Sequence, residues 1–226
     1  IFLFFFSPHK YINALNISLF LSANETDVNQ AILAGYPAGL ILKGHIFDVA
    51  HDEELRIAFD FDGVIADDSS EQIYKENGLG AFIENEKNLA DQPAIAGPLH
   101  KLLKELSTLQ KEELKYQTQY AEYKSRLRSS IVTARNAPAH KRVINSLRSW
   151  GINTVNEAFF LGGIEKRKVL EILQPHIFFD DQVGHLEKTA DSIASVHIPF
   201  GVANKKAAAT QSTQAKDITQ LTTQDS

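Results

Sequence analysis

The stretch that decides the fold is residues 55–65, which read LRIAFDFDGVI. Its first five residues alternate apolar side chains with others, the pattern of a buried strand, and Gly63 marks a turn after it. Asp60 and Asp62 come where the strand ends. Because ligands bind at the carboxyl ends of strands in an open α/β sheet, we expect both carboxylates to face one substrate. Taken alone, the motif would favour a solvated loop with an acidic turn.

The composition is that of a soluble globular protein. The 226 residues are 43% hydrophobic and 23% charged, which is enough apolar material for a full core. A net charge of −5 argues against binding to nucleic acid polymers. Lysines and arginines gather between Lys101 and Arg135, and we interpret them as a solvated helical face. Attraction of a phosphorylated substrate is the alternative interpretation of this density.

Cysteine usage and hydropathy bear on the compartment. The chain has no cysteine, which excludes disulfides and thiolate metal sites and fits a reducing cytoplasm. The opening residues 1–6, IFLFFF, lack a basic flank and fall far short of the roughly 20 residues that span a bilayer, so we expect a buried strand and no membrane segment. Methionine is also absent. That absence predicts either an internal fragment or a sequence from which modified methionines are missing.

Apolar runs alternate with amphipathic stretches along most of the chain. Strands are predicted around residues 19–21, 40–42, 55–59, 130–135, 158–161, 177–179 and 196–198. Helices are predicted at 26–34, 69–76, 80–89, 98–128, 138–150, 165–173 and 183–190, the first capped near Thr26 or Asp27. This alternation predicts an α/β fold, a Rossmann-like parallel sheet with helices on both faces.

The predicted elements divide the chain into three parts. Residues 1–54 form an N-terminal strand, helix and strand segment, residues 55–204 form the core, and residues 205–226 form a polar tail with little to bury. Residues 67–98 interrupt the core directly after the acidic strand, which predicts a small helical cap over the site. The N-terminal segment aligns at constant offset with the C-terminal unit, so we interpret it as a degenerate repeat, with chance similarity as the alternative.

Polar side chains follow four of the predicted strands in a fixed order. They are Asp60 and Asp62, then Thr133, then Lys166, then Asp180 and Asp181. This order resembles the haloacid dehalogenase-like phosphohydrolase superfamily. The segments LFLSANETDVNQAI, FDFDGVIADDSSE, IVTARNAPAHKRVINSLRSWGI, FFLGG and QPHIFFDDQ are similar to the cytosolic 5'-nucleotidase type I family. The resemblance covers nearly the whole chain except the opening hexapeptide and the tail. Phe61 departs from it, because it stands where that family usually has glycine.

The resemblance implies a Mg²⁺-dependent 5'-nucleotidase that acts on nucleoside 5'-monophosphates through an aspartyl-phosphate. It makes Asp60 the nucleophile and Asp62 the general acid and base. It makes Thr133 and Lys166 the phosphate-binding residues. The metal ligands that it implies are Asp60, the backbone carbonyl of Asp62 and one or both of Asp180 and Asp181.

Physical chemistry agrees with these roles. A phosphate dianion repels an attacking carboxylate, so a cation has to neutralise the charge, and Mg²⁺ prefers oxygen ligands. Arg167 and Lys168 compete with Lys166 for the cationic role, and a helix N-cap is the competing role for Asp181. The eight histidines show no ligand spacing and are expected to be surface or core residues.

Two other functions fit the same motifs. One is a phosphatase for a different small phosphomonoester, because the cap, not the four motifs, would select the base. The other is a nucleotide-binding module without turnover, which has no need of both a nucleophile and an acid. The sequence leaves the oligomeric state open.

Overall fold

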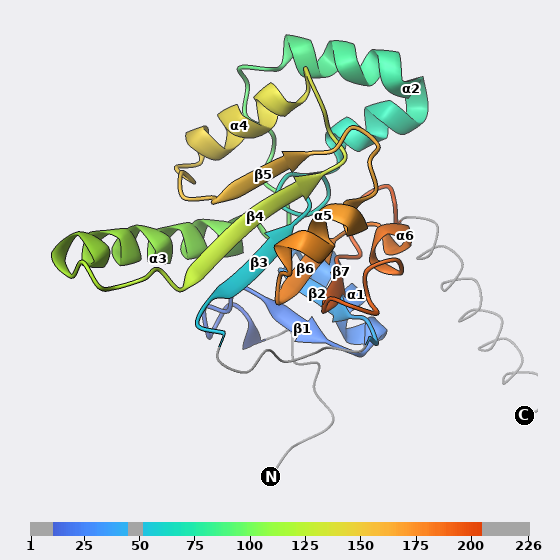
Figure 1. Ribbon diagram of the computed structural model, residues 1–226. Coiled ribbons are helices and arrows are strands. Elements are labelled where there is room, and N and C mark those ends of the chain that lie inside the picture. Colours follow the sequence, from blue (N-terminus) through green and yellow to red (C-terminus); the bar gives the residue numbers. More distant parts are fainter. Residues whose placement is uncertain (1–10, 45–51, 205–226) are drawn as a thin grey trace, which may run out of the picture.

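A computed structural model describes residues 11–44 and 52–204 (Figure 1). The strands are β1 Phe20–Ser22, β2 Ala38–Ile41, β3 Leu55–Phe59, β4 Leu127–Thr133, β5 Glu157–Phe160, β6 Ile177–Asp180 and β7 Ser195–His197. The helices are α1 Glu25–Leu33, α2 Ser69–Asn88, α3 His100–Gln119, α4 His140–Ser149, α5 Lys166–Leu173 and α6 Val183–Leu186. The strand predicted at residues 1–6 and the predicted tail lie outside the described residues. None of the helices described has the length and apolar character needed to cross a membrane.

The seven described strands form one sheet in the order β1-β2-β7-β6-β3-β4-β5. Neighbouring strands are parallel except β2 and β7, which pair antiparallel through Leu40 with His197 and Ile41 with Val196. The predicted α/β fold is therefore confirmed, with a sheet that is mostly rather than wholly parallel. The exception arises because β1, α1 and β2 join the sheet as a unit that runs against β7.

Helices cover both faces of the sheet (Figure 1). Phe59 points into a core cluster with Leu103 of α3, whereas its neighbour Ala58 points into a second cluster with Leu170 of α5. Successive side chains of a strand point to opposite faces, so β3 contributes to the cores on both sides. Burial on both faces fixes the register of β3 and therefore the position of the residues that follow it.

The first helix has a different cap from the one predicted. Asn24 is the N-cap, and its side-chain oxygen accepts hydrogen bonds from the amides of Thr26 and Asp27 at 3.0 and 3.4 Å. Asparagine suits this position because its short side chain reaches the first free amides of a helix. The β1-α1-β2 and β6-α6-β7 units both pair their strands in parallel, and their origin as a repeat stays a prediction.

The helix predicted to end at residue 128 stops earlier. α3 ends at Gln119, and β4 begins at Leu127 rather than near Ser130. The side chain of Glu113 on α3 accepts hydrogen bonds from the amides of Arg126 and Leu127 at 2.9 and 3.2 Å. These bonds fix the turn that brings the chain back to pair with β3.

Residues 67–95 leave the core and return to it at one place. An isolated bridge joins Ala66 to Ala96, and the amide of Gly97 donates to the carbonyl of Ile65 at 2.8 Å. A Cβ on Gly97 would lie 2.2 Å from the carbonyl oxygen of Ala66, so the close approach requires glycine. Figure 1 shows α2, with a break in its helical backbone at Gly78, beyond the carboxyl ends of β4 and β5. Its role as a cap stays a prediction.

Candidate active site

Three predicted site residues converge where β3 and β6 end. The amino group of Lys166, the first residue of α5, lies 2.8 Å from Asp60 Oδ2 and 2.7 Å from Asp180 Oδ2. Asp60 follows β3 and Asp180 ends the neighbouring β6, so parallel pairing brings the two carboxylates together. All three side chains are buried. We name Asp60, Lys166, Asp180, Asp181 and His185 the carboxylate cluster.

Local backbone turns orient the two bridged carboxylates. Asp60 Oδ1 accepts a hydrogen bond from the amide of Phe61 at 2.7 Å, and Asp180 Oδ1 accepts one from the amide of Gln182 at 2.8 Å. Each carboxylate therefore has one oxygen held by its own turn and the other by Lys166. Bonds from charged and backbone donors of this kind hold a carboxylate firmly in place.

The electrostatics of the cluster follow from burial and from the single lysine. Burial raises the pKa of Asp60 to about 7, against the opposing pull of Lys166. Burial also disfavours the charged form of Lys166, but Asp180 and Asp60 outweigh it and raise the pKa of the lysine. For Asp180, Lys166 and His185 outweigh the effect of burial and lower the pKa. The lysine is therefore held charged between two acids.

Asp181 is the exception within this cluster. It is 1% exposed, and neither carboxylate oxygen has a hydrogen-bond partner among the described residues. Burial, together with the nearby Asp60 and Asp180, raises its pKa to about 10. Gly63, at φ +71°, closes over it so tightly that an added Cβ would lie 2.6 Å from Asp181 Oδ2. A buried carboxylate without a partner is costly unless a cation completes it.

The carboxylate cluster fits a hard divalent cation. Asp60, Asp180 and His185 each offer one ligand atom, and these atoms lie within 4.8 Å of one another. The unpartnered oxygens of Asp181 are also of the type that Mg²⁺ prefers, but Asp181 is not among the residues whose ligand atoms lie that close together. His185 Nδ1 lies 3.1 Å from Asp180 Oδ2. The histidine therefore stands beside the carboxylates, either as a ligand or as their orienting neighbour.

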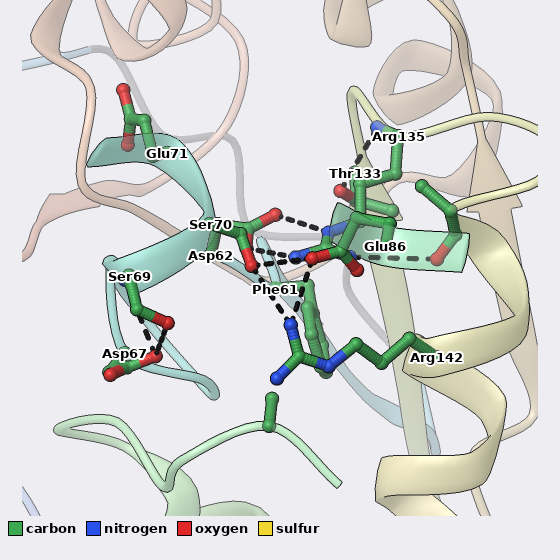
Figure 2. Close-up of polar contacts among 12 residues, drawn as sticks. Phe61, Asp62, Asp67, Ser69, Ser70, Glu71, Glu86, Thr133, Arg135 and Arg142 are labelled. Atoms are coloured by element: carbon green, nitrogen blue, oxygen red, sulfur yellow. Dashed lines mark hydrogen bonds and ion pairs between the residues drawn. The ribbon is translucent and has the colours of Figure 1, made fainter. Parts of the chain in front are cut away.

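Thr133 lies at the same edge of the sheet. It is the last residue of β4, which pairs with β3, and it is buried. Its hydroxyl oxygen accepts a hydrogen bond from the amide of Arg135 at 3.3 Å. The strand order thus brings the tip of β4 next to that of β3, and Figure 2 shows Thr133 beside Arg135.

Asp62 has a different environment from Asp60. Both of its oxygens accept hydrogen bonds from Arg135, at 2.7 Å from Nε and 2.6 Å from Nη2. The remaining guanidinium nitrogen pairs with Glu86 of α2, which in turn binds Arg142 of α4 at 2.8 Å and accepts from Ser70 at 2.7 Å (Figure 2). We name Asp62, Ser70, Glu86, Arg135 and Arg142 the arginine cluster.

Comparisons with known proteins identify the family of the chain. The sequence profile of the 5'-nucleotidase family matches residues 2–205. The chain belongs to the 5'-nucleotidase family. It is 36% identical over 182 residues, 80% of its length, to the human protein named Cytosolic 5'-nucleotidase 1B, and it spans 29% of that relative. No solved structure matches the chain at a significant level.

Within this 5'-nucleotidase family chain, the structure separates the competing basic residues. Lys166 is buried in the carboxylate cluster, whereas Arg167 and Lys168 are exposed and Arg167 pairs with Glu171 on its own helix. The geometry thus favours Lys166 for the cationic role.

Sequence reasoning missed several residues of the site. The lack of ligand spacing among the histidines argues against a role for His185, whereas its position five residues after Asp180, in the helix that follows β6, is a usable signal. Arg135 follows the strand-tip Thr133 by two residues and offered a similar signal. Glu86 and Arg142 had none, because they reach the site only through the packing of their helices.

Proposed function

We propose that the chain hydrolyses nucleoside 5'-monophosphates to nucleoside and phosphate with Mg²⁺, as a cytoplasmic phosphoric monoester hydrolase. Family membership and the name of the human relative support this assignment. The observation that carries it is the buried Asp60 beside Lys166, with two further carboxylates at the same edge of the sheet. Attack on a phosphate requires a nucleophile, a fixed positive charge and carboxylates that can hold a metal ion. Asp60, Lys166 and the two further carboxylates match these three requirements.

In the first step, Asp60 attacks the phosphorus atom and the bond to the ribose 5' oxygen breaks. The product is an aspartyl-phosphate on Asp60. Asp62 gives its proton to the departing ribose oxygen, because an alkoxide is a poor leaving group. Lys166 holds the phosphoryl oxygens, and Thr133 donates a hydrogen bond to them.

In the second step, the carboxylate of Asp62 takes a proton from a water molecule. That water attacks the phosphorus, and the bond to Asp60 breaks to release phosphate and restore the free carboxylate. Splitting the displacement in two lowers each barrier. Asp62 ends the cycle with the proton it began with.

Asp60, Asp180 and Asp181 would hold the metal ion, with the backbone carbonyl of Asp62 as a further donor and His185 beside Asp180. When bound, Mg²⁺ supplies the positive charge that lets a phosphate dianion approach an aspartate. The unpartnered oxygens of Asp181 are the structural support for this site.

A phosphate-release assay tests the function directly. We expect release from nucleoside 5'-monophosphates with Mg²⁺, none with EDTA, and slower release from sugar phosphates. Asp60→Asn, nearly the same in size, should lose about 10³-fold or more in turnover because it removes the nucleophile. Release from sugar phosphates alone would favour another phosphatase. Nucleotide binding in calorimetry without release from any substrate would favour the binding module.

A further inference from the structure

The guanidinium of Arg135 is held from four directions. Asp62 binds one edge through two hydrogen bonds, and Glu86 pairs with the other. The rings of Phe61 and Phe82 lie 5.3 and 5.4 Å from Arg135 Cζ. Aromatic rings at this distance attract a cation through their faces. The arginine, which is 5% exposed, is therefore confined to one orientation.

In the pair formed by Asp62 and Arg135, the aspartate is the more exposed partner. The side chain of Asp62 is 18% exposed, against 3% for that of Arg135. A carboxylate has about four lone-pair positions, so a two-pronged contact with arginine leaves others available for proton exchange. Arg135 thus fixes how the carboxylate of Asp62 is presented without covering it.

The orientation of Arg135 depends in turn on α2. Glu86 is fully buried and accepts hydrogen bonds from Arg135, Arg142 and Ser70. Arg142 Nε also donates to the carbonyl of Gln92 at 3.1 Å, just beyond the end of α2. Figure 2 shows these side chains meeting between α2 and α4. Two of the four contacts on Arg135, those from Glu86 and Phe82, therefore exist only when α2 is packed against the tips of the strands.

We propose that Arg135 is a positioning residue for Asp62, and that Glu86 makes its action depend on the packing of α2. The inference rests on the proposed function, because it matters only if Asp62 transfers protons. It makes the orientation of the proton donor a property of the segment between residues 67 and 95, not of the strand tip alone.

Arg135→Lys is the test variant, because lysine keeps the buried positive charge but cannot make the two-pronged contact. In single-turnover experiments with Mg²⁺, release of nucleoside from a nucleoside 5'-monophosphate should fall roughly 10- to 100-fold, as loss of oriented general acid predicts. Release of p-nitrophenol from p-nitrophenyl phosphate needs no proton, so its rate should change less than about threefold. A purely structural role for Arg135 would lower both rates by the same factor.

Arg56→Lys is the matched control. Arg56 lies on β3, and its guanidinium binds both oxygens of Asp52 at 3.2 and 2.6 Å, at the opposite end of the strand from Asp62. The same substitution there removes a similar contact far from the site. Both release rates should stay unchanged.

Two further variants extend the test, and the second, Glu86→Gln, makes it independent of how well Arg135→Lys folds. In a protein that already carries Asp62→Asn, adding Arg135→Lys should slow nucleoside release by less than about twofold. The reason is that the effects of two substitutions are not additive when one residue acts through the other. Glu86→Gln should also slow nucleoside release more than p-nitrophenol release, but the fall in nucleoside release should be smaller than that caused by Arg135→Lys.

The outcomes separate the two proposals. The wild type should release product from both substrates if the proposed function is right. If it does, the positioning role is wrong when Arg135→Lys and Glu86→Gln lower both release rates by the same factor. It is also wrong when Arg135→Lys slows nucleoside release in the Asp62→Asn background as much as it does in the wild type. If the wild type releases neither nucleoside nor p-nitrophenol, both proposals are overturned.

Discussion

Two buried groups of charges lie at the same end of the sheet and are built in opposite ways. In the carboxylate cluster, the one lysine bonds two of the three aspartates, and the third, Asp181, has no hydrogen-bond partner among the described residues. In the arginine cluster, two acids face two arginines, and every carboxylate oxygen of Asp62 and Glu86 is bonded. One short stretch of chain contributes to both groups, because Asp60 and Asp62 are only two residues apart.

This contrast indicates that the carboxylate cluster binds a ligand and that the arginine cluster has a structural role. An unpaired buried charge destabilises a fold, so an incomplete group at a strand tip indicates that something binds there. A balanced network gains from its low-dielectric surroundings and fixes the orientation of its members. The carboxylate cluster therefore fits a cation and a phosphate, and the arginine cluster fits the positioning of Asp62.

The largest expected effect on stability comes from breaking the balanced network. Arg142→Met leaves Glu86 with half of its compensating charge, so the free energy of unfolding should fall by about 3 kcal/mol. Urea unfolding measures this change. Arg167→Met, which removes an exposed arginine paired on its own helix, is the control and should leave the urea midpoint unchanged. A fully stable Arg142→Met protein would show that the network is not needed to hold α2.

The incomplete cluster should respond in the opposite direction. Asp181→Asn keeps the shape of the side chain but removes a carboxyl whose pKa burial raises to about 10. Folding at neutral pH then no longer has to protonate this group, so in EDTA the free energy of unfolding should rise by about 1–3 kcal/mol. Ligands that bind only the folded state stabilise it, so Mg²⁺ should raise the melting temperature of the wild type more than that of the variant. Thermal unfolding with and without Mg²⁺ measures both effects. A variant destabilised in EDTA would mean that Asp181 has a partner in solution.

The difference between the clusters also explains what the sequence could predict. The convergence of Asp60, Lys166 and Asp180 could be predicted because Asp60 and Asp180 come at the ends of apolar runs and Lys166 follows the turn after a third run. Strand tips of a parallel sheet meet at one edge. The α/β fold followed from the same alternation. Burial and register, which are properties of the assembled sheet, then decided which of the neighbouring basic residues entered the site.

Only part of the arginine cluster carries such a signal, because Asp62 and Arg135 follow strand tips whereas Glu86 and Arg142 do not. Glu86 and Arg142 lie on helices whose meeting depends on how α2 packs, and no spacing in the sequence encodes that contact. The antiparallel pairing of β2 with β7 escaped prediction for the same reason, since it depends on how two separate units join. Long-range packing is the part of this structure that pattern alone does not contain.

The smallest expected effect on stability comes from an arginine-aspartate pair near the surface, which serves as a comparison for the buried pair. Asp52 and Arg56 make a two-pronged contact like that of Asp62 and Arg135, but near the surface. Hydrogen bonds from Arg56 lower the pKa of Asp52 from 3.8 to about 2. A carboxyl whose pKa is lower in the folded state stabilises the fold above its unfolded pKa and loses that contribution as the pH falls through the folded one.

Asp52→Asn should therefore be slightly less stable than the wild type above pH 4, and the gap should close between about pH 4 and pH 2. Urea midpoints of the two proteins across that range measure the gap. Salt should narrow it at neutral pH, because exposed pairs are screened and buried ones are screened much less. A gap that persists at pH 2 would mean that Asp52 contributes through packing. In that case the surface pair would no longer serve as the electrostatic counterpart of the buried one.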